Sequence, residues 1–346
     1  MRLYYIAIVI LVSVLAGNFQ AFAQSQNQQS QNQVQQQNQV QTQQQAIASR
    51  IAPEKTMAPD WYATLSDDHK HNINLLLDYW QKKSAEVKRY QCDFVRYDYD
   101  TSICNWRDSR NGQLAAASIM TGEIRFASPD RAYYQTEQVF DFEKPPEQEG
   151  QDPSYKPRSE VTQKEKWICD GNAIYEFDFQ NKKLYETVIP AEMQGKGLVN
   201  SPLPFLFGAS RTDILDRFWV RIATPDGVTN EYWLEAFPKK IEDARNYKKL
   251  ELVLSRDELF LPIMMHIYAP NYNPKENNLT SRVFEFKNRQ VNGGLAAVKN
   301  FLGFFVRPRL PMGFERVKRN GLQANPQFDP ARLQRPAQAP GKNPIR

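Results

Sequence analysis

A helical pattern of apolar positions opens the folded part of the chain. Between residues 66 and 88, apolar side chains recur every three or four positions, at Ile73, Leu76, Leu77, Trp80 and Val87. This spacing places them on one face of an amphipathic helix. Ser66, Asp67 and Asp68 come first, and such residues cap and stabilise helix N-termini. The pattern predicts a long helix over residues 66–88 that can lie across a sheet.

An alternation with a period of two follows this helix. In the run YQCDFVRY, which starts at residue 90, every second residue faces the same side of a strand. Similar short runs continue to about residue 305, separated by tight turns at Asp170-Gly171, Gln180-Asn181 and Asp226-Gly227. Asp-Gly favours hairpins because glycine accepts a positive φ. We therefore expect an antiparallel meander, and a sheet of so many strands curls.

Two segments interrupt the strand pattern. Residues 144–158 are rich in Pro, Glu and Gln, which predicts an exposed insertion loop. Residues 201–218 begin with Pro202 and Pro204, which suit helix starts, and predict one or two short helices. The elements together predict an α+β fold, in which a curled antiparallel sheet forms a half-barrel. The long N-terminal helix and the short mid-chain helices would cover it.

The ends of the chain differ from this core. Arg2, the apolar run 3–16 and Ala21-Phe22-Ala23 are typical of a signal peptide, residues 1–23, cleaved after Ala23; an uncleaved anchor is the alternative. We therefore expect an exported, periplasmic protein. Residues 24–57 are rich in Gln, which predicts a disordered linker. A single domain over 58–318 is expected, followed by a basic disordered tail over 319–346. That tail could serve solubility or attract anionic lipid or cell-wall polymer.

Charge and cysteine content exclude some functions and leave others open. The net charge of +5 is mild and spread out, so it does not indicate nucleic-acid binding. An exported location permits disulfides, and Cys92 and Cys104 could close a short loop that leaves Cys169 as a buried thiol. Because the count of three is odd, the pairing stays open.

Catalytic and metal-binding motifs are missing from the sequence. It holds no glycine-rich phosphate loop, no GxSxG and no HExxH, so we expect no enzyme, no metal and no cofactor. His69 and His71 fit a solvated helix surface better than a metal site, and His266 fits a structural role better than a cavity. Asp98 and Asp100 share a strand face that could suit a cation, although paired acids at a strand end are more often turn residues.

The order of these pieces resembles the LolA/LolB-like outer-membrane lipoprotein carrier superfamily, and specifically a planctomycete group of exported proteins. The similarity covers most of residues 66–314. It is carried by YQCDFVRYDYD, GEIRFASPDRAYYQTE, WICDGNAIYEFDFQNKKLYE, SPLPFLFG, YWLEAFPK, YKKLELVLSRDELFLPIMMHIYAP and the run from FEFKNRQVN to FLGFFVRPRLPMGFE. The carriers have a basic latch residue before the proline of the second strand. Here Ser128 precedes Pro129, which puts the family's lid mechanism in doubt.

The resemblance implies a half-barrel that shelters an acyl chain or another apolar group. The residues that we expect to line such a cavity are Phe177, Phe205, Phe218, Leu252, Met265 and Phe284. The expected partners are a lipid acyl chain or a lipoprotein, with an envelope protein and peripheral membrane contact as further candidates and no nucleic acid. The alternative is a non-enzymatic structural or interaction protein of the cell envelope, with a filled core and with tails that make the contacts.

Overall fold

A computed structural model describes residues 56–148, 150–158, 164–191, 194, 210–293 and 301–319. They belong to the unit that begins at Lys55. The expected signal peptide, residues 24–55 of the expected linker, residues 320–346 of the expected basic tail and the candidate residue Phe205 lie outside the described residues.

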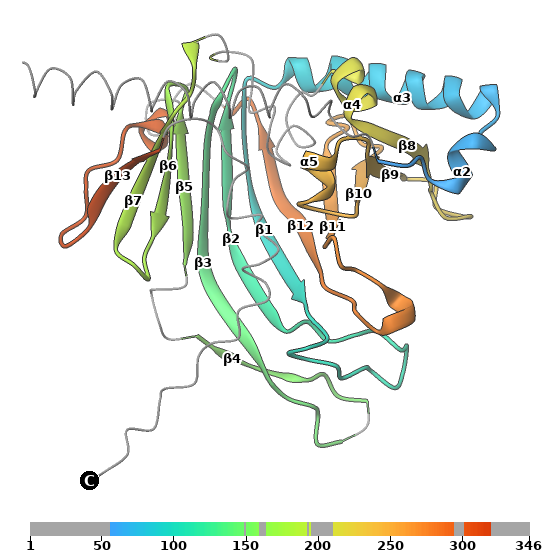
Figure 1. The fold of residues 1–346 in the computed structure, drawn as a ribbon, viewed down its shortest axis with the longest axis horizontal. Helices are drawn as coiled ribbons and strands as arrows, with labels where there is room; N and C mark the ends of the chain where they lie inside the picture. The colour runs from blue at the N-terminus through green and yellow to red at the C-terminus, as the bar shows by residue number, and fades with distance from the viewer. Residues whose placement is uncertain are drawn as a thin grey trace, which may run out of the picture. The chain divides into compact units, whose positions relative to one another are not determined.

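Strands dominate the described part of the chain and form one 13-stranded sheet (Figure 1). The strands are β1 (Arg89–Tyr99), β2 (Ser118–Ala127), β3 (Arg131–Lys144), β4 (Ser154–Pro157), β5 (Glu165–Asp170), β6 (Ala173–Asp178), β7 (Lys183–Val188), β8 (Phe218–Ile222), β9 (Glu231–Pro238), β10 (Lys249–Ser255), β11 (Pro262–Tyr268), β12 (Ser281–Val291) and β13 (Glu315–Arg319). The helical elements are α2 (Asp60–Ala63), α3 (Asp67–Glu86), α4 (Arg211–Arg217), α5 (Ile241–Ala244), η4 (Pro274–Glu276) and η5 (Gly303–Phe305). The fold is therefore mainly β with a few helices, rather than the α+β class that the sequence suggested.

The sheet is open and curled. Its strand order is β13-β7-β6-β5-β3-β2-β1-β12-β11-β10-β9-β8, with β4 paired to β3 beside this path. β8 and β13 are its two ends, so the path does not close into a barrel (Figure 1). The neighbours are antiparallel as expected, except that β13 runs parallel to β7. The chain leaves β12 near the middle of the sheet, and β13 pairs at its far end.

The helix expected over residues 66–88 is present as α3. The Ser66 hydroxyl caps it by accepting a hydrogen bond from the His69 amide at 3.2 Å. Its apolar side chains Ile73, Leu76, Leu77 and Trp80 are buried. They join one cluster with residues from many strands, among them Phe94 and Leu252. We call the side of the sheet that carries this cluster the α3 face.

A second cluster covers the other side of the sheet, which we call the opposite face. It joins Tyr133, Ile168, Tyr175, Phe177 and Leu184 with Phe301 and Phe305, which lie on the chain that leads towards β13. The described residues that lead into β13 therefore pack against the opposite face. The sheet is buried on both sides at this point.

The insertion loop expected over residues 144–158 is partly a strand. β3 extends to Lys144, and β4 folds back against it with Phe142 paired to Tyr155. The rings of Phe142 and Tyr155 lie 5.9 Å apart, edge to face. Pro157 is tolerated because it ends a short strand at the edge. The composition of the segment hid the anchor at Tyr155.

Candidate functional site

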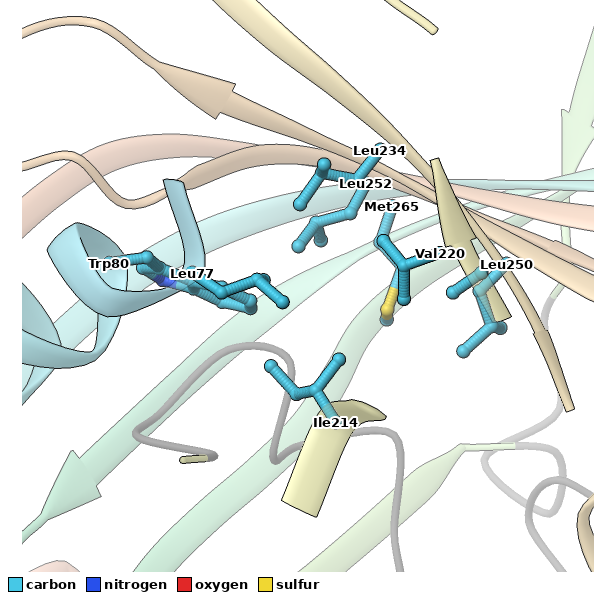
Figure 2. A pocket seen from close by; sticks show the side chains of 9 residues that line it. Leu77, Trp80, Ile214, Val220, Leu234, Leu250, Leu252 and Met265 are labelled. Carbon is cyan, nitrogen blue, oxygen red and sulfur yellow. The ribbon is translucent and has the colours of Figure 1, made fainter. Parts of the chain in front are cut away.

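A small apolar cavity lies between α3, α4 and strands β8 to β11, and we call it the α3 cavity. Figure 2 shows side chains from the two helices and from the sheet converging on it. Its lining is Leu77, Trp80, Ile214, Val220, Leu234, Ala236, Leu250, Leu252 and Met265. Its volume is about 10 Å³, roughly the space of one water molecule. In the described conformation the cavity is therefore nearly filled by its own side chains.

Four of the expected cavity residues lie on the α3 face. Leu252 and Met265 line the α3 cavity itself. Phe218 and Phe284 belong to the same apolar cluster, and Phe284 is the direct cross-strand neighbour of Met265. All four are buried, with at most 4% of their surface exposed.

Phe177 lies on the opposite face, away from the α3 cavity. It pairs with Lys166, whereas Trp167, one position further along β5, belongs to the α3-face cluster. Because successive residues of a strand point to opposite sides, Phe177 is carried into the second cluster. The sequence could not assign this side because apolar residues cover both faces of the sheet here.

A row of aromatic rings crosses the α3 face beside the cavity. Phe94 stacks on Tyr134 at 5.0 Å, and Tyr134 stacks on Trp167 at 5.8 Å. Phe284 continues the row, 5.7 Å from Phe94. The strand β2 lies between Phe94 and Tyr134, and it presents Gly122 at this point. The two rings meet because glycine has no side chain to separate them.

Charged residues interrupt the same face. We call this group, which consists of Arg96, Asp98, Tyr134, Glu165 and Arg282, the Arg96 network. Arg96 is only 1% exposed. It donates hydrogen bonds to Glu165 Oε2 at 2.6 Å, to the Tyr134 hydroxyl at 2.9 Å and to Asp98 Oδ2 at 3.1 Å. Arg282 donates to Asp98 Oδ1 at 2.9 Å. Two guanidinium groups therefore face two carboxylates within a largely apolar surface.

The network holds its acidic partner in the charged form. Burial alone would raise the pKa of Glu165, but the Arg96 guanidinium lowers that pKa to about 2 by charge attraction and hydrogen bonding. Burial raises the pKa of the Tyr134 phenol well above its ordinary value. Glu165 is therefore a carboxylate at neutral pH, and Tyr134 stays a neutral donor.

Sequence reasoning missed the Arg96 network, although one signal for it was present. In the alternating run of β1, Arg96 occupies the same parity as the inward-facing Cys92 and Phe94. An arginine at that position needs buried acidic partners. Asp98 is one of them, and it pairs with arginines. Asp100 instead accepts a hydrogen bond from the Ser102 amide in a turn.

The cysteines form no disulfide. Cys92, Cys104 and Cys169 are all free and buried. Cys92 belongs to the α3-face cluster, whereas Cys104 packs in a separate small cluster. Burial raises the pKa of Cys92 and of Cys169 to about 12, so these thiols stay protonated and unreactive at neutral pH.

The histidines are not gathered with other ligands. His69 and His71 are exposed on the first turns of α3. His266 lies 3.5 Å from Glu251 and stacks on Tyr268. Across the described ranges, no three His, Cys, Asp or Glu side chains are arranged to hold a metal ion. Within the same ranges, no helix is both long and apolar enough to span a bilayer.

Comparisons with known proteins return structural neighbours only. No protein-family model and no curated protein matches this chain. Solved structures that match include an uncharacterized conserved protein from Thermus thermophilus, with a TM-score of 0.36, 8% identity and coverage of 72% of this chain and 99% of the other. A LolA superfamily protein from Nitrosomonas europaea matches with a TM-score of 0.26, 9% identity and coverage of 66% and 96%.

A third neighbour has a related description. It is a putative outer membrane lipoprotein-sorting protein domain from Vibrio parahaemolyticus, with a TM-score of 0.24, 11% identity and coverage of 65% and 97%. The neighbours thus include the LolA superfamily that the sequence resembles. At these TM-scores and identities they assign no function to this chain.

Proposed function

We propose that this protein is an exported, non-enzymatic binding module of the cell envelope that takes a lipid acyl chain, free or on a lipoprotein, at the α3 cavity. The proposal rests on the kind of contacts that attach α3 to the rest of the molecule. Its inner side contacts the sheet through apolar side chains. Among the described residues, its hydrogen bonds to the rest of the molecule run to Asn292 at its C-terminal end and to Arg211 of α4.

This arrangement suits a cover that can be lifted. The Asn292 side chain donates to the Glu86 carbonyl at 2.8 Å and accepts from the Lys88 amide at 2.8 Å, which fixes the end of the helix. The ion pair between Arg211 and Asp78 is largely exposed, and exposed pairs contribute little. An acyl chain could then enter between α3 and the sheet while one end of the helix stays attached.

The free energy that lifting α3 would cost and the free energy that a bound acyl chain would contribute are of similar size. Lifting Ile73, Leu76, Leu77 and Trp80 away from their apolar contacts would cost about 6–12 kcal/mol, at about 1.5–3 kcal/mol for each side chain. Burying an acyl chain of about sixteen carbons gains roughly 12 kcal/mol before ordering costs. The ligand would therefore replace the apolar contacts that opening removes, and no charged anchor is required for binding.

A filled-core scaffold is the second candidate, and the cavity volume favours it. A space of about 10 Å³ cannot hold an acyl chain unless the helices move. If they do not move, the described unit is a rigid support, and its function would lie in contacts with an envelope protein.

A quenching experiment separates the two candidates. The delipidated full chain is titrated with a brominated fatty acid, which quenches only the tryptophans that it touches. We expect quenching of Trp80, which lines the cavity, and loss of that component in Trp80→Phe. Trp219→Phe is the matched control, because Trp219 packs against Tyr62 outside the α3-face cluster. Saturable quenching of equal amplitude in both variants, or no quenching at all, would refute the proposal.

A further inference from the structure

The Arg96 network lies in line with the α3 cavity. On the α3 face, direct cross-strand neighbours run from Leu252 to Met265, from Met265 to Phe284 and from Phe284 to Arg96. Adjacent strands are about 4.8 Å apart, so Arg96 lies about 10 Å from Met265 along this row. One continuous surface therefore passes from an apolar cavity to a buried guanidinium group.

A buried ion pair is weak evidence of a stabilising role. Burying an ion pair costs desolvation energy that its attraction often fails to recover, and apolar replacements are commonly neutral or stabilising. The rest of the row is apolar on this side, and the Arg96 guanidinium lies 5.8 Å from the Phe284 ring. A second charged pair, Arg282 with Asp98, lies beside it. The position is therefore suited to a charged group that an apolar ligand would bring.

Glu165 is the exchangeable member of the network. Its side chain is 26% exposed, compared with 1% for Arg96 and 10% for Asp98. It is also the first residue of β5. An anion that replaced the Glu165 carboxylate would keep Arg96 neutralised, and the Tyr134 hydroxyl would still be available to donate.

We propose that the α3 cavity selects an amphiphile whose head is a carboxylate or a phosphate, and that this head binds Arg96 in place of the Glu165 carboxylate. The inference rests on the proposed function, because it names the ligand class of the same site. The acyl chain would fill the space beneath α3 and α4, and the head would lie across Phe284 at the Arg96 network.

Matched ligands test this preference with the delipidated full chain. Equilibrium affinities are measured for a fatty acid and for the fatty alcohol of the same length, and for a lysophosphatidate and the corresponding monoacylglycerol. We expect the anionic member of at least one pair to bind about tenfold more tightly or better, as for a gained charge-assisted hydrogen bond. The pair that shows the preference identifies the head as a carboxylate or a phosphate.

Glu165→Gln tests the assignment to Arg96. Removal of the competing carboxylate should strengthen binding of the preferred anionic ligand by about tenfold and leave its neutral partner unchanged. A gain in affinity cannot come from misfolding. Glu176→Gln is the control, because Glu176 is a buried acid that pairs with Arg319 instead, and it should change neither affinity.

The outcomes separate the two levels of the proposal. Equal binding of the anionic and neutral ligands would overturn the head-group inference and leave acyl-chain binding intact. A preference that Glu165→Gln does not strengthen would overturn the role of Arg96. Binding of none of the four ligands would refute the proposed function together with the inference.

Discussion

Gly122→Ala tests whether the aromatic row depends on a missing side chain. A Cβ atom at this position would overlap the Gln135 carbonyl oxygen and lie 2.7 Å from Cζ of Phe94. Both approaches are far inside van der Waals contact. The first neighbour is backbone on the paired strand, so no rotamer change can relieve it. We expect a loss of about 3 kcal/mol in the free energy of unfolding, at the upper end of the range for overpacking.

Urea unfolding of the full chain, followed by far-ultraviolet circular dichroism, measures this loss. Gly303→Ala is the matched control, because a Cβ there meets nothing within 4 Å. It should shift the free energy of unfolding by less than about 1 kcal/mol. Phe94→Leu combined with Gly122→Ala should cost less than the sum of the two single changes, because the ring contact is shared. If Gly122→Ala is tolerated as well as Gly303→Ala, the role assigned to Gly122 is wrong.

Three further predictions concern charge, the hold on α3 and the thiols. Burial alone would raise the pKa of Glu165 and of Glu251, but their partners lower both from 4.5 to about 2. Each carboxylate should therefore contribute on the order of 3 kcal/mol to the free energy of unfolding above about pH 5, and this contribution is lost as the pH falls towards 2. A free energy of unfolding, measured with urea, that stays constant between pH 5 and 3 would contradict this. Asn292→Ala should lower the free energy of unfolding by about 1–3 kcal/mol and speed hydrogen exchange at the C-terminal end of α3. Unchanged exchange there would show that Asn292 does not fix the end of this helix. Cys92 and Cys169 should react with a thiol reagent only after unfolding, whereas rapid reaction in the native protein would show that they are accessible.

The main lines of the fold follow from local sequence patterns. The helical spacing of Ile73, Leu76 and Leu77 identifies α3, and the Asp-Gly turn at Gly171, where φ is +93°, joins β5 to β6. The parallel return of β13 was not predictable, because the pairing partner of a strand far along the chain depends on the whole sheet. The strand β4 was hidden by a polar composition.

The candidate site was predictable only in part. Leu252 and Met265 could be recognised as members of apolar strands, but a strand that is apolar on both sides does not reveal which side faces a helix. Phe177 shows this limit. The Arg96 network depends on Glu165 and Arg282, which are distant in sequence, so only the parity of Arg96 in its strand could have indicated a buried charge.

Native mass spectrometry with lipid extraction tests the central claim most directly, on protein purified from its own cells without detergent. We predict a co-purifying acyl species in near one-to-one amount, and its mass would identify the ligand. A clean unliganded mass that persists when the protein is challenged with fatty acids and lipopeptides would contradict acyl-chain binding. It would identify the described unit as a filled scaffold instead.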